Sequence, residues 1–403
     1  MPESELKGSA KLGTYLKQLR VGYGYSLRRV EEKARMVGGE IDNSQLSRYE
    51  KGRCYPSFDK LRVLASIFNV SIQSFSDIVD VEEYESLRPD TDAYDELIAA
   101  GNRQMEMGSY AEAYAAFQKA IDVAESPDAE ESGEDTRATR LARGHYGLAR
   151  ALLKLGKLAL AENELRNVLR VGGGVDRQTI IKTLLQLSNA HADLGDSFLA
   201  RLEAEKCLAI AREESDRRSL AYAMHQLGRI AGEEGDAKGA LAYFRDALVA
   251  YEEQSDTFGV LTMKINIGAC HISLSHFKVG TKLIQEALRV ARQEGMRRTS
   301  AFAVSKLLEA EYAQGNMSKA KAYIREVGAL AGAETEEDRY TDFLFNAAYY
   351  LWRIARRERN AIQEKIAFGR LKYLRSALER VSPEVEEFDA FIGQRKSHEN
   401  VGA

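Results

Sequence analysis

The sequence predicts an all-α protein, with a small helical domain followed by a right-handed α-solenoid of repeats. Only 5 prolines occur in 403 residues, so few positions interrupt a helix. Apolar residues recur at helical spacing, and a pattern of small residues returns about every 40 residues over the later part of the chain. A chain of this length exceeds one compact core, so we expect separate domains or an extended array.

Composition excludes several classes of protein. Hydrophobic residues make up 44% of the chain and charged residues 29%, which is typical of soluble folded proteins. The N-terminal segment MPESELKGSAKL does not resemble a signal peptide, and no apolar run is long enough to span a bilayer. The three cysteines, Cys54, Cys207 and Cys270, are far apart and favour reduced thiols. We therefore expect a cytoplasmic protein.

Charge is distributed unevenly along the chain. Residues 7–70 contain 13 Lys and Arg against 6 Asp and Glu, a net charge of +7. Because the whole chain carries −4, the remainder must sum to −11. A basic N-terminal segment on an acidic body favours contact between that segment and phosphates.

Five short helices are predicted in the N-terminal 80 residues. Leu12, Leu16 and Leu19 define the first, which ends near the glycines at 22–24. Ser26 is expected to cap a second helix over 27–35, and Asp42 a third that runs to Gly52. A polar, glycine-containing stretch over 36–42 separates these two. Further helices are predicted over 58–68 and 72–79.

The segments SLRRVEEKA and SQLSRYEKGRCYPSFDKLRVLASIFNVSI resemble the Cro/repressor (Xre-type) helix-turn-helix family over roughly residues 11–79. This resemblance implies binding of double-stranded DNA, with the third helix in the major groove. Asn and Gln can pair with adenine there, and Arg and Lys can contact phosphate or base. Carried over by position, the DNA-binding residues are Arg28, Asn43, Ser44, Gln45, Ser47, Arg48, Lys51 and Arg53. The resemblance also implies an ion pair between Arg20 and Glu50.

Two features depart from the family pattern. Ala34 and Leu46 are twelve residues apart, so the stretch MVGGEIDN contains about five more residues than the usual turn. Glu31 stands where the family has a small residue beneath that turn. Both favour a splayed turn. The alternative is a helix-turn-helix that is used only for contact with protein.

The body of the chain has a regular repeat. The turn positions are Gly108, Gly156, Gly195, Gly235, Ser275 and Gly315. Seven positions before a turn the residue is small, namely Gly101, Ala149, Ser188, Gly228 and Gly268, with Leu308 as the exception. Nine positions after a turn it is usually large and apolar, as at Phe117, Leu165, Phe244, Ile284 and Ile324. Small residues allow two helices to cross closely. The pattern resembles a lengthened tetratricopeptide repeat.

These patterns divide the chain into four parts. Residues 1–80 are the predicted helix-turn-helix domain and 81–91 the linker. Residues 92–380 hold six to seven repeats, interrupted by an acidic loop over 125–136. Residues 381–403 form a C-terminal cap and tail that cover the end of the array.

No motif predicts an enzyme, a cofactor or a metal. The three glycines at 172–174 lack the frame of a phosphate-binding loop, and His271 and His276 are five residues apart, without a third ligand. The arginines near 353–359 are interpreted as a solvated face. The aromatic group is interpreted as core of the C-terminal cap, with a dimer interface as the alternative; it consists of Tyr340, Phe343, Phe345, Tyr349, Tyr350 and Trp352.

The first helix of each repeat is expected to line a concave groove. Its inward positions are Asn102, Tyr146, Arg150, Lys154, Lys182, Asn189, Tyr222, His225, Arg229, Thr262, Phe302 and Glu309. A mixture of cations, amides and aromatics suits an extended peptide, and an ordinary solvated surface is the alternative. Arg150, Asn189 and Arg229 occupy the same position of repeats two to four and are the strongest candidates for peptide contacts.

A Cro-like domain joined to such repeats resembles the bacterial and phage peptide-pheromone receptors of quorum sensing, which regulate transcription. The resemblance implies that a short peptide in the groove alters the spacing of two DNA-binding domains in a homodimer. One alternative is an adaptor that binds a protein partner while its N-terminal domain rests on DNA. Another is a phosphatase-like or antiactivator role of the repeats that is independent of DNA.

Overall fold

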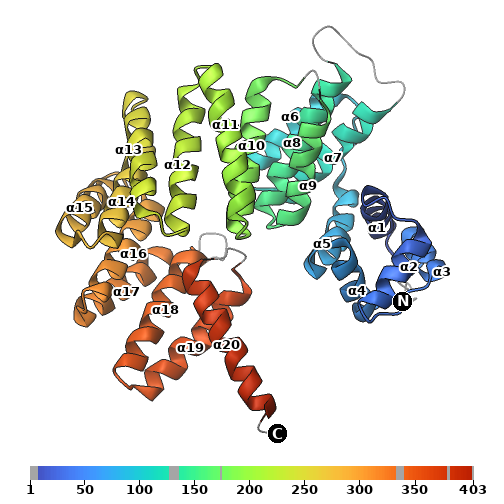
Figure 1. Ribbon diagram of the computed structural model, residues 1–403. Helices are drawn as coiled ribbons and strands as arrows, with labels where there is room; N and C mark the ends of the chain where they lie inside the picture. Colours follow the sequence, from blue (N-terminus) through green and yellow to red (C-terminus); the bar gives the residue numbers. More distant parts are fainter. Residues whose placement is uncertain (1–7, 127–135, 173–174, 333–339, 379–381, 402–403) are drawn as a thin grey trace. The chain divides into compact units, whose positions relative to one another are not determined.

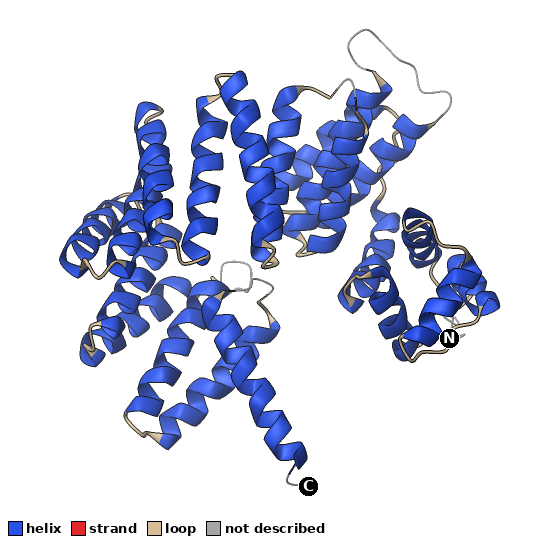
Figure 2. Cartoon of the chain, in the orientation of Figure 1, coloured by secondary structure: helices blue, strands red, loops and turns tan. Residues whose placement is uncertain are grey.

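The computed structural model of the protein describes residues 8–126, 136–172, 175–332, 340–378 and 382–401. Within these ranges every regular element is a helix, which confirms the predicted all-α class (Figure 2). The chain forms two compact units, Met1–Thr183 and Leu184–Ala403, each described by itself below. Most of the predicted 125–136 loop lies outside the described residues.

Unit 1 begins with the five predicted helices, which form one small core (Figure 1). Ser26 accepts a hydrogen bond from the Arg29 backbone N–H, and Asp42 accepts one from that of Gln45, so both predicted caps are confirmed. Leu16, Val30, Ala34 and Leu46 are fully buried in this core. The helices are α1 (Ala10–Gly22), α2 (Leu27–Met36), α3 (Asn43–Glu50), α4 (Phe58–Phe68) and α5 (Ile72–Glu82).

The long connection between α2 and α3 is anchored at three points. Ile41 is 2% exposed and joins the core. Gly39 packs so closely on α4 that a Cβ there would lie 2.3 Å from Cγ2 of Val63. The Glu31 carboxylate accepts a hydrogen bond from the Asn43 backbone N–H at 3.3 Å. Glu31 thus serves as a second N-terminal cap of α3, which gives this departure from the family pattern a physical role.

The stretch from 81 to 91, expected as a linker, contains the last residues of α5 and the short helix η1 (Glu83–Leu87). Val81 is 1% exposed and lies in one apolar cluster with Phe117 and Ile121 of the first repeat. The ammonium of Lys157 pairs with Asp77 at 2.9 Å and with Asp80 at 2.5 Å. Helix α5 is therefore packed against the repeats of the same unit.

The repeats are pairs of antiparallel helices. Unit 1 contains α6 (Tyr94–Met107), α7 (Tyr110–Glu125), α8 (Arg137–Lys154) and α9 (Leu158–Arg170), and α10 (Arg177–Asp193) spans the boundary between the units. Unit 2 continues with α11 (Ser197–Glu213), α12 (Arg217–Glu233), α13 (Ala237–Glu253), α14 (Thr257–Ser273), α15 (Phe277–Gln293), α16 (Arg297–Ala313), α17 (Met317–Ala331), α18 (Thr341–Arg357), α19 (Ala361–Ser376) and α20 (Pro383–Val401).

The predicted turn and crossing positions are confirmed. All five turn glycines, and Ser275, adopt the left-handed conformation, with φ between 63° at Ser275 and 85° at Gly235. At Gly228 an added Cβ would lie 2.6 Å from the ring of Phe244, and Gly268 crosses Ile284 in the same way. Leu308, the exception, is fully buried. The two helices of each pair therefore approach most closely where the sequence has its small residues.

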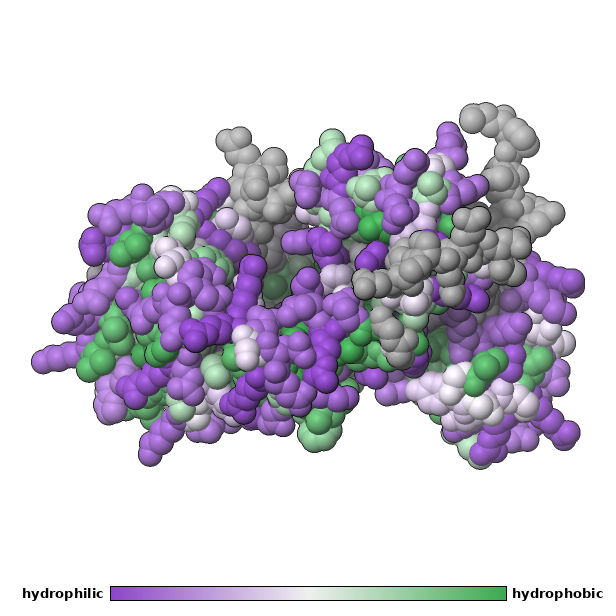
Figure 3. Space-filling view, turned by 90° about the horizontal axis from the view of Figure 1, so that it is seen from above, coloured by the Kyte–Doolittle hydropathy of each residue, from purple (hydrophilic) through white to green (hydrophobic). Residues whose placement is uncertain are grey.

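The C-terminal helices close the array around aromatic side chains. Trp352 is 1% and Phe345 2% exposed, and both belong to a cluster that includes Phe388 of α20. This agrees with the interpretation of the aromatic group as core. Helix α20 spans most of the stretch expected to form the C-terminal cap and tail. On one face of the molecule, hydrophilic side chains cover most of the surface between smaller hydrophobic patches (Figure 3).

Candidate DNA interface and ligand pocket

The predicted DNA-binding residues lie on the surface of the N-terminal domain, on and around α3. Gln45 and Ser47 are half-buried, and the other six are exposed: Arg28, Asn43, Ser44, Arg48, Lys51 and Arg53. Among the described residues, none of the four cations in this group forms an ion pair with a carboxylate. The cations are thus available to an external anion.

Asp42 fixes the N-terminus of α3. Its carboxylate accepts hydrogen bonds from the Ser44 hydroxyl at 2.6 Å and from the Gln45 backbone N–H at 2.7 Å. These hydrogen bonds, that from Ser44 first, hold the pKa of Asp42 below its usual value. Asp42 is therefore ionised at neutral pH and holds the first turn of α3. The Ser44 hydroxyl is engaged in this contact and would have to rotate to contact another group.

Five of the predicted groove residues belong to unit 1: Asn102, Tyr146, Arg150, Lys154 and Lys182. The Arg150 guanidinium donates to the Asn102 side-chain oxygen at 3.3 Å across neighbouring repeats. In unit 2, Asn189 is half-buried, and Tyr222 packs edge-on against Tyr251 with 5.8 Å between ring centres.

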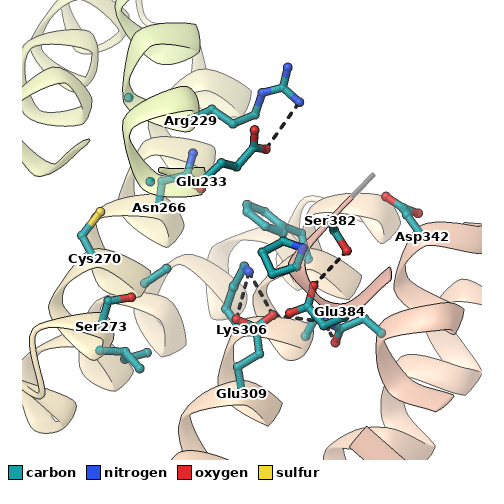
Figure 4. A pocket seen from close by; sticks show the side chains of 18 of the residues that line it. Arg229, Glu233, Asn266, Cys270, Ser273, Lys306, Glu309, Asp342, Ser382 and Glu384 are labelled. Carbon is teal, nitrogen blue, oxygen red and sulfur yellow. Dashed lines mark hydrogen bonds and ion pairs between the residues drawn. The ribbon is translucent and has the colours of Figure 1, made fainter. Parts of the chain in front are cut away.

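Unit 2 contains a cavity of about 430 Å³ on the inner side of its repeats, between α12, α14, α16, α18 and the segment before α20 (Figure 4). Five of the twelve predicted inward residues line it, namely His225, Arg229, Thr262, Phe302 and Glu309. The other seven do not. Further residues line the cavity at positions that were not predicted, among them Asn266, Lys306, Asp342, Asn346 and Glu384. The cavity lies in the fourth to seventh helix pairs, rather than the second to fourth.

A half-buried ion pair occupies one end of the cavity. The Lys306 ammonium donates to both carboxylate oxygens of Glu309 at 2.9 Å, and the Asn346 amide donates to one of them at 3.4 Å. The Glu309 side chain keeps 22% exposure because it faces the cavity, but protein surrounds it on the other sides. This burial raises the pKa of Glu309 against the opposing effect of Lys306.

Arg229 and His225 of α12 define the other end. The Arg229 guanidinium pairs with Asp193 at 3.0 Å and donates from Nε to Gln226 at 3.1 Å. Its Nη2 is buried and has no hydrogen-bond partner among the described residues. Burial, and then the charge of Arg229, lowers the pKa of His225 to about 4, so this imidazole is neutral at pH 7. Asn266 lies 3.4 Å from its Nε2.

Three of the lining residues that were not predicted lie at fixed distances from the turn residues of their repeats. Asn266 and Lys306 both lie nine positions before their turn residues, Ser275 and Gly315. Asn346 lies thirteen before the left-handed turn residue Arg359, as Thr262 and Phe302 do before theirs. Extending the inward positions to the seventh pair would have found Asn346. No repeat pattern points to Glu384, because it lies outside the array.

Other candidate chemistry is sparse in the described part of the chain. His271 and His276 are 3.4 Å apart through their Nδ1 atoms, and no third ligand joins them in a group that could hold a metal ion. None of the described helices is both long and apolar enough to cross a membrane.

Two protein-family models match parts of the chain. The helix-turn-helix family matches residues 16–75. The family described as anaphase-promoting complex subunit 5 matches three separate stretches, 61–132, 174–234 and 237–313. The first stretch extends from α4 of the N-terminal domain through the first helix pair, and the other two lie within the repeats. No curated protein matches the sequence.

Solved structures share the fold at low identity. The apo form of RapI is 12% identical with a TM-score of 0.58, covering 70% of this chain and 97% of that one. A Rap protein complexed with Competence and Sporulation Factor is 13% identical with a TM-score of 0.52, covering 78% and 96%. The Rap conjugation gene regulator of plasmid pLS20, in complex with the Phr* peptide, is 14% identical with a TM-score of 0.52, covering 93% and 96%.

Proposed function

Because this chain carries an Xre-type helix-turn-helix domain ahead of tetratricopeptide-like repeats, we propose that it is a transcription regulator that binds specific DNA under the control of a peptide ligand. The observation that carries the proposal is the surface on and around α3, where the four cations named above form no ion pair among the described residues and the Asn43 and Gln45 amides are exposed or half-buried. The cations supply affinity for phosphates, and Asn43 and Gln45 supply hydrogen bonds that distinguish bases. The proposed activity is binding, without catalysis.

The ligand is proposed to be a short peptide held in the cavity of unit 2. A volume of about 430 Å³ is within the usual range of ligand sites. Asn266 and Asn346 line the cavity with side-chain amides, which carry donors and acceptors like the alternating N–H and C=O groups of an extended backbone. Asn346 uses one N–H toward Glu309 and one lone pair toward Ser305, and keeps the second of each. The buried Nη2 of Arg229 offers a further donor. Two of the solved proteins of this fold are described as complexes, one with Competence and Sporulation Factor and one with the Phr* peptide, and the second supports a peptide here.

We further propose the domain limits given above, with the helix-turn-helix domain over 1–80, the linker over 81–91, the repeats over 92–380 and the cap over 381–403. A homodimer in the cytoplasm is part of the proposal, because one recognition helix of this type supplies little affinity alone. Peptide binding would then alter the spacing of two DNA-binding domains. Sedimentation of the chain with and without DNA tests the dimer.

The test of DNA binding uses the double variant Gln45→Ala and Arg48→Ala. Neither side chain belongs to the core, so the fold should remain intact while specific binding is lost, at a cost of about 1–3 kcal/mol for each base contact. A selected DNA sequence is titrated against both proteins by fluorescence anisotropy at several salt concentrations. Wild-type affinity should fall steeply with salt, because several phosphates are neutralised. Equal affinity and specificity of the two proteins would refute the groove assignment.

The test of the ligand is a screen of host peptides and host proteins against the full chain. Binding of a peptide, with altered DNA affinity, supports the receptor. Binding of a folded protein alone, with the cavity residues unprotected from chemical labelling, supports the adaptor.

A further inference from the structure

Helix α19 carries an exposed apolar line. Ile362, Ile366 and Tyr373 are 77%, 66% and 59% exposed, and Gly369 lies between the last two with open space around it. The spacing of i, i+4, i+7 and i+11 places the four residues on one face of the helix. This face is distinct from the inner face, where Leu371 and Leu374 are buried.

The same face is polar in one other helix, α15. Counted from the left-handed turn residues, Arg359 before α19 and Ser275 before α15, the four positions of α19 correspond to four exposed polar residues of α15. These are Lys278, Lys282, Gln285 and Arg289. A solvated face of this solenoid can thus be wholly polar. Three large apolar side chains in line at the same positions indicate a contact surface.

Positive charge flanks the apolar line on both sides. Lys365 and Lys372 lie on one side and Arg370 on the other, and all three are exposed. Among the described residues none of them pairs with a carboxylate, and Lys372 lies over the ring of Phe368 at 6.0 Å. A second copy docked through the same face would bring three cations against three cations. Such like-charge contact is unfavourable, whereas carboxylates would complement this rim.

We infer that α19 is a docking surface for an amphipathic helix of another protein, whose apolar side chains are flanked by carboxylates. Ile362, Ile366 and Tyr373 would interdigitate with the apolar side chains of the partner. Gly369 would let the two backbones approach where the helices cross. This surface is separate from the residues around α3 and from the ligand cavity, so it adds a partner to the proposed regulator.

The probe is a labelled designed peptide, about 20 residues long, with leucines along one helical face and glutamates on both flanks; the matched peptide has lysines on the flanks. The full chain should bind the glutamate peptide at least about tenfold more tightly. Ile366→Asp should abolish this binding. Lys282→Asp, at the same position of α15 and also exposed, should leave it unchanged. Both variants alter only exposed side chains, and circular dichroism checks their fold.

The flanking charges have their own test. The double variant Lys365→Glu and Lys372→Glu should reverse the preference, so that the lysine peptide binds more tightly. Equal binding of the two peptides to wild type, or binding that survives Ile366→Asp, would overturn the inference. Two further results would also overturn it. If sedimentation showed a dimer that Ile366→Asp dissociates, the face would belong to a contact with a second copy. If the chain floated with anionic lipid vesicles and Ile366→Asp abolished this, the face would bind a lipid surface.

Discussion

Arg20 holds Glu50 through two hydrogen bonds, from Nε at 2.6 Å and from Nη2 at 2.9 Å, and thereby ties α1 to the end of α3. Only 14% of the arginine side chain and 8% of the glutamate side chain are exposed. The pair that the family resemblance implied is thus confirmed. It fixes the helix that carries the proposed base contacts, although neither residue faces outward with them.

Removing one partner of this pair should destabilise the N-terminal domain. Arg20→Ala leaves the Glu50 carboxylate buried without its partner, and we expect a loss of about 3–5 kcal/mol in the free energy of unfolding. Arg29→Ala is the control, because its pair with Glu32 is exposed and should contribute at most about 1 kcal/mol. Thermal unfolding followed by circular dichroism measures both. Similar melting temperatures for the two variants would contradict a structural role for Arg20.

Glycine should be required where two helices cross but not elsewhere in a helix. Gly228→Ala places a methyl group within 2.6 Å of the Phe244 ring, and we expect about 1–3 kcal/mol of destabilisation from the forced repacking. Gly328→Ala in α17 meets nothing within 4 Å and should stabilise by up to about 1 kcal/mol, through the helix propensity of alanine. Denaturant titration compares the two. If Gly228→Ala left the free energy of unfolding unchanged, the crossing of α12 and α13 would not require glycine.

Peptide affinity should depend on the cavity and not on the second repeat. Arg229→Ala removes a donor that lines the cavity, and we expect a loss of about 1–3 kcal/mol in peptide binding. Arg150→Ala, at the same position of an earlier repeat, should leave the affinity unchanged because Arg150 does not line the cavity. Isothermal titration with the peptide found in the screen measures both. The reverse order of effects would restore the ligand site expected from the sequence at repeats two to four.

His225 should make unit 2 sensitive to mild acid. Its pKa in the folded protein is about 4, below the ordinary value of 6.5, so the unfolded chain binds the proton first. The contribution of the neutral His225 to stability is therefore fully present above the unfolded pKa of 6.5 and is lost as the pH falls toward 4. The free energy of unfolding should fall by about 2 kcal/mol between pH 7 and pH 5. His225→Gln should remove this part of the dependence. Denaturant unfolding at both pH values is the measurement, and an unchanged slope in the variant would refute the assignment.

The local features of the fold could be predicted from the sequence because each needs a particular residue at a particular place. A left-handed turn favours glycine, a helix N-terminus favours Ser or Asp, and a close crossing needs a small side chain. Gly235, Asp42 and Gly228 meet these three requirements in the structure as predicted. The surface position of the α3 residues follows from the same local pattern.

The position of the cavity was decided by the tertiary structure. Inward positions recur in every repeat with the same spacing, so the sequence could not distinguish the groove at Arg150 from the groove at Glu309. Which of them converge depends on how successive pairs stack and on where the chain returns after α19. Ser382 and Glu384 come from that return and complete the cavity, although no repeat period predicts them. Helical periodicity therefore determined which face of each helix turns inward, and only the packing of distant segments determined where those faces enclose a site.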